Sequence, residues 1–159
     1  MRVQASHRAS STTHGRAAFV PVLPAETHGG AAVVGAESNV ELSVCNMTRN
    51  HAGSYGGAVA VTSQGFAYTS TVAGYRHTVV FVNNTAKRGG GALSLGLDAA
   101  ATLSGALFEG NAALTGGAIY TDATLLVGTY HSYGVLRVSN TTFLGNKVSC
   151  AAPAARARP

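Results

Sequence analysis

The feature that most constrains how this chain can fold is a short motif that recurs along it. An aromatic residue is followed three positions later by asparagine, and then by a polar connection, two glycines, alanine and an aliphatic residue. The aromatic position, which methionine takes once, and the asparagine position are filled by Met47 and Asn50, Phe81 and Asn84, Phe108 and Asn111, and Phe143 and Asn146. The second glycine stands at positions 30, 57, 91 and 117, so the copies lie 27, 34 and 26 residues apart. A motif that returns every 20–50 residues or so, about the length of one supersecondary unit, indicates a repeat architecture.

The segments that carry the motif indicate strands rather than helices. Residues 40–44 alternate between apolar and polar side chains, as in a half-buried strand, and residues 58–61 keep the same period of two. The unit is too short and too strand-like for a helical-hairpin repeat. We therefore expect an all-β fold in which each unit is one coil of a solenoid, with three short strands per turn and coils about 4.8 Å apart.

Stacked coils place residues of the same repeat position above one another. The aromatic position would then form a core stack of Met47, Phe81, Phe108 and Phe143. The asparagine position would form a ladder of Asn50, Asn84, Asn111 and Asn146. Each amide of this ladder can hydrogen-bond the corner backbone and its neighbours above and below.

Two further apolar rows and the glycine pairs complete the expected coil. Val59, Leu93 and Ile119 would form an aliphatic row. Val40 and Leu42 would align with Leu136 and Val138, in a row that Gly74 and Arg76 interrupt. The glycine pair would supply the positive φ or the close backbone approach that a corner needs. Extra length is concentrated in residues 62–77 and 121–134, and we expect both insertions to project from one face of the stack.

Charge and cysteine usage limit the classes of partner. The net charge is +5, but residues 39–150 hold six Lys or Arg against four Asp or Glu, without the dense basic stripe of a nucleic-acid binder. No apolar run reaches the roughly 20 residues of a transmembrane helix. The two cysteines, Cys45 and Cys150, have no metal-ligand spacing, so we predict neither a metal nor a cofactor. About three coils, or roughly 14 Å, would separate them, so we expect two unpaired thiols.

The composition divides the chain into three parts. Residues 1–28 are predicted to be a loose N-terminal segment without a clear signal peptide, because the apolar stretch 19–25 is short and broken by two prolines. Residues 29–148 form the repeat domain. Residues 149–159 form a basic tail rich in alanine, arginine and proline.

The repeated pair of motifs, aromatic-x-x-asparagine and Gly-Gly-Ala with an aliphatic residue, resembles the repeat of the chlamydial polymorphic outer membrane proteins. Related repeats occur in other pectin-lyase-like β-helix proteins. The resemblance covers about residues 29–148 and implies a right-handed parallel β-helix, here of about three to four coils. It also implies a surface-exposed or secreted protein, often an adhesin. The small number of repeats leads us to expect either a fragment of a larger adhesin or a stand-alone relative.

Two groups of residues are candidate sites. Asp98 and Asp122 follow the Gly-Gly-Ala strands of successive units, so they are weak candidates for an acid–base pair or a cation site. The second group lies in the two insertions, where aromatic and polar side chains would form a binding surface for a glycan or a protein. Its members are Tyr68, Tyr75, Arg76, His77, Tyr130, His131 and Tyr133. The alternative is that these rings cover the side of the coil and pack locally.

The leading functional hypothesis is a non-enzymatic adhesive or structural module at the cell surface. Its rival is a carbohydrate-active β-helix enzyme of the lyase or hydrolase type, which the scarcity of acidic residues in the repeats disfavours. Coil ends without an obvious cap also predict end-to-end self-association.

Overall fold

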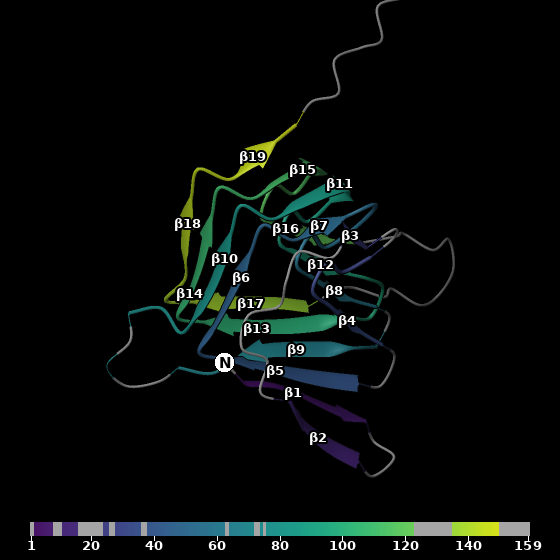
Figure 1. Ribbon diagram of the computed structural model, residues 1–159, viewed down its shortest axis with the longest axis vertical. Helices are drawn as coiled ribbons and strands as arrows, with labels where there is room; N and C mark the ends of the chain where they lie inside the picture. Colours follow the sequence, from purple (N-terminus) through teal and green to yellow (C-terminus); the bar gives the residue numbers. More distant parts are fainter. Residues whose placement is uncertain are drawn as a thin grey trace, which may run out of the picture.

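The computed structural model describes residues 2–7, 11–15, 24–25, 28–35, 38–62, 64–71, 74, 76–122 and 135–149. Within these ranges every regular element is a β-strand, and no helix is present that could cross a membrane. The strands form four sheets that stand around a common core (Figure 1).

The four sheets are named I to IV in the order in which a coil meets them. Sheet I has the order β17 (Val135–Ser139), β13 (Ala100–Ser104), β9 (Phe66–Thr69), β5 (Ser38–Ser43), β1 (Arg2–His7) and β2 (Ser11–Gly15). Sheet II consists of β18 (Thr142–Leu144), β14 (Ala106–Glu109), β10 (Val79–Val82) and β6 (Cys45–Thr48). Sheet III consists of β19 (Lys147–Val148), β15 (Ala112–Thr115), β11 (Thr85–Gly89), β7 (His51–Ala52) and β3 (Pro24–Ala25). Sheet IV consists of β16 (Ile119–Thr121), β12 (Leu93–Leu95), β8 (Val59–Val61) and β4 (Ala32–Val34).

The chain passes through sheets I, II, III and IV in turn and then begins the next coil. Neighbouring strands of successive coils pair in parallel, so the fold is a parallel β-helix of about four coils. The prediction of three strands per turn was wrong, because the polar segment that follows each asparagine is itself a strand of sheet III. This strand is only two residues long at His51–Ala52, which is too short to show an alternating pattern.

The motif residues stack in register inside the coils. Phe81 lies opposite Met47 on one side and Phe108 on the other, and Phe108 lies opposite Phe143. The ring centroids of Phe81 and Phe108 are 4.6 Å apart, and those of Phe108 and Phe143 are 5.0 Å apart. Leu93 lies between Val59 and Ile119 in the same way in sheet IV. These rows form the core that stabilises the helix.

The four asparagines form a continuous hydrogen-bonded ladder. The backbone N–H and the Nδ2 of Asn50 both donate to Oδ1 of Asn84, at 2.9 Å each. Asn84 donates in the same two ways to Asn111, and Asn111 donates to Asn146. The Nδ2 groups of Asn84, Asn111 and Asn146 each donate in addition to a backbone carbonyl of the preceding coil, as Asn84 does to Met47 at 2.9 Å. Asn50, Asn84 and Asn111 are fully buried.

The apolar row of sheet I differs from the expected one. Val40 and Leu42 are aligned with Ala67 and Thr69 of β9, so Gly74 and Arg76 do not belong to this row. The reason is that the extra residues of this coil follow β9 rather than precede it. The next coils continue the row with Ala101 and Leu103, and then with Leu136 and Val138.

The two insertions leave the helix at different corners, which corrects the expectation of a single projecting face. The first lies between β9 and β10, where sheet I passes to sheet II. The second lies between β16 and β17, where sheet IV passes to sheet I, and residues 123–134 within it lie outside the described residues.

The two glycines of each pair meet different requirements. Gly90 has a φ of 66°, which suits a residue without a side chain. Gly91 has no such φ, but a Cβ there would stand 2.8 Å from the carbonyl carbon of Ala112 in the next coil. The first glycine therefore allows the corner to form, and the second allows the coils to stack closely.

The start of the helix has a different pairing from the rest. β1 pairs antiparallel with β5 and with β2, whereas every other pair of strands is parallel. β1, β2 and β3 lie within residues 1–28, and the boundary predicted at residue 29 stays a prediction. Cys45 is a free, buried thiol, and Cys150 lies outside the described residues.

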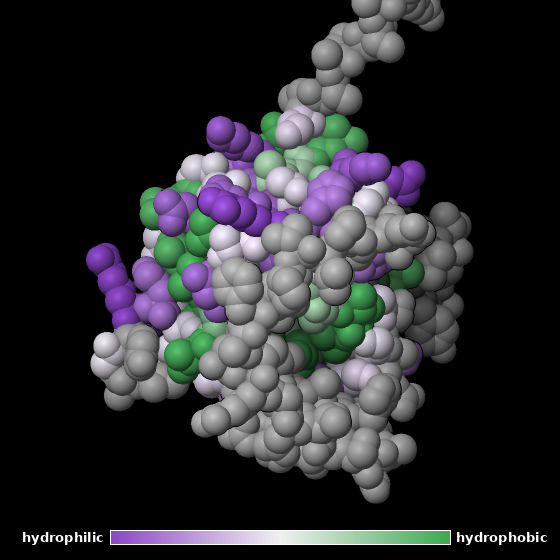
Figure 2. All heavy atoms as spheres, in the orientation of Figure 1, coloured by the Kyte–Doolittle hydropathy of each residue, from purple (hydrophilic) through white to green (hydrophobic). Residues whose placement is uncertain are grey.

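The outer side of sheet II carries apolar side chains beside polar ones such as Asn46 and Glu109. Val80, Val82 and Leu107 alternate with buried residues and are half-buried, and Leu144 is 50% exposed. Figure 2 shows apolar side chains on this side of the molecule, where β10, β14 and β18 lie in Figure 1.

Candidate binding groove

A groove of about 230 Å³ lies on the outer side of sheet IV. Its floor follows from the period of two along the strands. Val59, Val61, Leu93 and Leu95 belong to the core, so the residues between them, Ala60 and Ser94, point outward. Ala60 pairs with Ser94, and Ser94 pairs with Tyr120, so the floor and one wall come from three successive coils. The groove is lined by His28, Tyr55, Ala60, Val61, Thr62, Ser94, Leu95, Gly96, Leu97, Tyr120 and Asp122.

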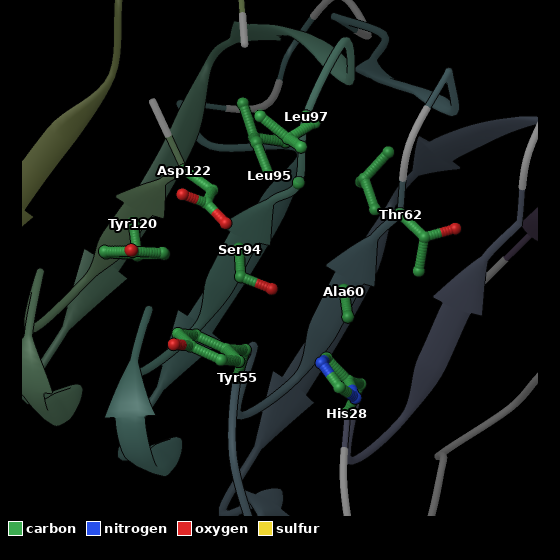
Figure 3. A pocket seen from close by; sticks show the side chains of 11 residues that line it. His28, Tyr55, Ala60, Thr62, Ser94, Leu95, Leu97, Tyr120 and Asp122 are labelled. Atoms are coloured by element: carbon green, nitrogen blue, oxygen red, sulfur yellow. The ribbon is translucent and has the colours of Figure 1, made fainter. Parts of the chain in front are cut away.

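Three aromatic side chains form a row along one side of the groove (Figure 3). The rings of His28 and Tyr55 stack with their centroids 5.6 Å apart, and those of Tyr55 and Tyr120 are 5.2 Å apart. His28, Tyr55 and Gly89 occupy one column of successive coils, through two parallel bridges. Tyr120 belongs to β16 and not to this column, but its ring lies beside Gly89 and completes the row.

Gly89 leaves the space in which the Tyr120 ring lies. A Cβ at Gly89 would stand 2.7 Å from Cγ of Tyr120 and 3.0 Å from its Cδ2. A larger residue in this column would therefore exclude the ring. The register of β11 also shifts between Ala86 and Gly89, which is a β-bulge. Bulges re-aim side chains, and here Arg88 brings its guanidinium 6.0 Å from the centroid of the Tyr55 ring.

Polar groups lie beside the aromatic row. Asp122 follows β16 directly, and its backbone N–H donates to the carbonyl of Leu95 at 2.8 Å, which holds it against the groove. In Figure 3, Asp122, Tyr120, Ser94 and Tyr55 lie together at one end, and Thr62, Ala60 and His28 lie toward the other. Partial burial, the Asp122 carboxylate and Tyr55, in that order, raise the pKa of Tyr120 above its ordinary value.

The two predicted aspartates have different surroundings. Asp122 lines the groove, whereas Asp98 is an exposed residue of the turn after β12, with a φ of 56°, and does not line it. No group of three or more His, Cys, Asp or Glu side chains that could hold a metal ion is found among the described residues. A catalytic role of the two aspartates stays a prediction.

The predicted binding residues of the first insertion that the structure describes lie in different elements, and their role in binding stays a prediction. Tyr68 lies in strand β9 rather than in a loop, on the outer side of sheet I, and its hydroxyl donates to Glu41 at 3.3 Å. Its ring stacks on that of Phe66, with centroids 5.6 Å apart. Arg76 is exposed and His77 is half-buried in the connection before β10. Tyr75, Tyr130, His131 and Tyr133 lie outside the described residues.

Apart from Asp122, the residues that form the groove were not predicted from the sequence. Tyr55 directly precedes the pair Gly56 and Gly57. Tyr120 directly follows the Gly-Gly-Ala-Ile segment 116–119, which lies two coils later. The signal was therefore present: these are the two tyrosines outside the insertions, and both lie next to a Gly-Gly-Ala strand. Ser94 and His28 carry no sequence signal of their own.

Comparison with protein families finds the Chlamydia polymorphic membrane protein (Chlamydia_PMP) repeat at residues 78–96 and 105–122. Each matched segment runs from the phenylalanine strand of sheet II to the strand of sheet IV that follows the glycine pair. No match was found among curated proteins, and none among solved structures. The two central coils of the chain are thus similar to the Chlamydia polymorphic membrane protein repeat, which indicates a repeat module of a surface or outer-membrane protein.

Proposed function

We propose that this β-helix is a non-enzymatic adhesive module that binds a glycan through the groove of sheet IV. The observation that carries the proposal is the row of His28, Tyr55 and Tyr120 beside the hydroxyls and the carboxylate of the groove. A sugar ring has an apolar face and a rim of hydroxyl groups. Aromatic side chains with polar tips match both, because the ring covers the apolar face while nearby groups hydrogen-bond the rim.

The size and shape of the groove support a ligand that is a segment of a longer chain. Its volume of about 230 Å³ is below that of typical drug-binding pockets, which are roughly 300–1,000 Å³. The groove runs across strands of several coils, so an oligosaccharide can lie along it with one sugar at the tyrosines. Bonds to Ser94 and Thr62 would then fix its orientation.

The composition of the lining favours binding over hydrolysis. Glycosidases commonly use two carboxyl groups on opposite sides of the scissile bond, about 5–9.5 Å apart. Asp122 is the one carboxylate among the described residues that line the groove. The described part of the lining therefore supplies groups that can hold a sugar, and one carboxylate rather than a pair.

Binding to an array of neutral and acidic oligosaccharides, with product release followed in the same wells, tests the proposal. We expect binding without turnover, and a loss of about tenfold or more in affinity for Tyr120→Ala, because a tyrosine at a binding site is often a dominant contact. Tyr68→Ala, on the outer side of sheet I, is the matched control and should bind as the unchanged chain does. Turnover, or binding that survives Tyr120→Ala and is lost in the control, would overturn the proposal. The proposal would also be overturned if the chain bound a protein ligand and none of the glycans.

A further inference from the structure

We infer that the outer side of sheet II is a glycosylated face, on which Asn46, Asn83 and Asn140 accept N-linked glycans. The inference goes beyond the proposed binding function and does not depend on it. It follows from a short motif in the sequence, from the exposure of the three asparagines and from their position in the fold.

The motif is an asparagine followed two positions later by threonine, with a residue other than proline between them. It occurs at residues 46–48, 83–85 and 140–142. This is the acceptor sequence for N-glycosylation. The chain contains eight asparagines, and the motif is distributed unevenly among them. None of the four ladder asparagines is followed by this hydroxyl, whereas three of the other four are.

The three asparagines of the motif are exposed, whereas three of the ladder asparagines are fully buried. Asn46 points outward from β6, because its neighbours Cys45 and Met47 belong to the core. Asn83 stands at the corner between sheets II and III, and Asn140 at the corner between sheets I and II, with φ of 53° and 45°. Asparagine tolerates this φ, which explains the residue type at the corners but not the threonine that follows. A glycan on any of the three would extend into solvent and displace no core side chain.

The structure places the hydroxyl of the motif next to the amide at Asn46. Residues two apart on a strand point to the same side, and the Thr48 hydroxyl donates to Oδ1 of Asn46 at 2.5 Å. This hydrogen bond uses the oxygen of the amide and not Nδ2, which is the atom that accepts the sugar.

The modification needs a transferase and an oligosaccharide carried on a lipid pyrophosphate. Nδ2 of the asparagine forms a bond to C1 of the first sugar, and the bond between C1 and the pyrophosphate oxygen breaks. The lipid pyrophosphate leaves, and the amide loses one proton to a base of the transferase. The transfer takes place on the extended chain, so the structure decides whether the modified chain can fold.

The modified asparagines border the apolar part of sheet II. One column of outward side chains runs from Asn46 through Val80 and Leu107 to Thr142, the threonine of the third motif. Val80 and Leu107 are half-buried. Glycans are bulky and solubilising, so those at the two ends of this column would shield its apolar side chains from other molecules. None of the three asparagines lines the groove of sheet IV, so the glycosylated face and the proposed binding site are separate.

The test is mass spectrometry of the chain isolated from its natural source and treated with peptide N-glycosidase in water enriched in oxygen-18. The enzyme converts a glycosylated asparagine to aspartate with a heavy oxygen, which marks each modified position. We expect marks at Asn46, Asn83 and Asn140, and none on the ladder. Fewer than two marked positions on sheet II, or a mark on a ladder asparagine, would overturn the inference.

Matched variants of the full chain, secreted from a eukaryotic cell behind a cleavable signal peptide, provide a second measurement. Thr142→Ala should lose the mass of one glycan, whereas Thr142→Ser should keep it, because serine retains the hydroxyl. Loss of the glycan in both variants, or in neither, would contradict the assignment of Asn140. The glycosylated chain should bind the oligosaccharide array as the unmodified chain does. Binding of no sugar by either form would overturn the proposed function and leave the glycosylated face standing.

Discussion

Asn84 connects three coils through one side chain. Its Oδ1 accepts two hydrogen bonds from Asn50, and its Nδ2 donates to Oδ1 of Asn111 and to the carbonyl of Met47. All of this takes place in a fully buried environment. A buried polar group without a partner costs more than an average hydrogen bond contributes, so the ladder is stable only when it is complete.

Asn84→Ala should therefore destabilise the fold strongly. It removes the acceptor of the backbone N–H and Nδ2 of Asn50, and it removes one donor each from Oδ1 of Asn111 and the carbonyl of Met47. We expect a loss of about 3–5 kcal/mol in the free energy of unfolding, measured in urea. Asn46→Ala, at an exposed position of β6, is the matched control and should change the free energy by about 1 kcal/mol or less. Equal effects of the two substitutions would contradict the role of the ladder.

The pKa of the Cys45 thiol depends on its burial in the folded core. Burial raises its pKa from the ordinary value of 9.0 to about 12, against a small opposing effect of the N-terminal charge. Because the folded state holds the proton more tightly, this group stabilises the fold fully below pH 9.0, and the contribution is lost as the pH rises toward 12.

We expect the folded chain to resist a thiol reagent at Cys45, and the contribution of this thiol to the free energy of unfolding to fall as the pH rises from 9.0 toward about 12. Cys45→Ala should show a smaller fall over the same interval, although the substitution itself costs some packing. Rapid labelling of Cys45 in the folded chain at neutral pH would show that the thiol is not buried.

Gly89→Ala should change the shape of the groove while the coil remains folded. The backbone at Gly89 does not have a positive φ, so alanine fits the backbone and meets the Tyr120 ring instead. We expect the displaced phenol to become more exposed and its pKa to return toward the ordinary value, as followed by absorbance with Tyr120→Phe as the reference. Glycan affinity should fall with it. An unchanged titration of Tyr120 would contradict the described position of the ring.

At the scale of the strand, the sequence predicted the stacking better than it predicted the number of strands. The alternation in residues 40–43 is visible because β5 has six residues, and buried positions alternate with less buried ones along all of it. The strands of sheet III have no such pattern: β7 and β19 have two residues each, and β11 contains the bulge. Their pairing depends on neighbouring coils, and a single unit of sequence does not contain that information.

The second glycine of a pair sets how closely two coils approach. Gly91→Ala should prevent stacking, because its Cβ would meet the backbone of the next coil rather than a side chain that can move. We expect a loss of about 3 kcal/mol or more in stability, or a failure to fold. Gly35→Ala is the matched control, because its Cβ would lie 3.9 Å from the nearest atom, Oγ of Ser38. Thermal unfolding of both variants checks the prediction, and similar melting temperatures would refute it.

At the scale of the whole molecule, burial is uneven along the helix axis. Phe81 and Phe108 are fully buried, whereas Phe143 is 46% exposed in the last described coil. The predicted end-to-end self-association stays a prediction, and sedimentation of the chain over a range of concentrations tests it.

The groove was not predictable from the sequence because its parts come from separate coils. His28, Tyr55 and Tyr120 are distant in the chain, and the ring of Tyr120 reaches Tyr55 only because Gly89 leaves space between them. The insertions drew attention to their tyrosines, of which Tyr68 lies on another sheet. Asp122 was named for its place after a strand, and its neighbours became visible only in the folded coil.

Binding in the groove of sheet IV is tested most directly by a nuclear magnetic resonance titration of the isotopically labelled chain with a β-linked N-acetylglucosamine tetramer. We expect the largest shift changes at Tyr55, Ser94, Tyr120 and Asp122, which share this groove. Changes centred on Phe66 and Tyr68 of sheet I, or spread evenly over the chain at saturating sugar, would contradict it.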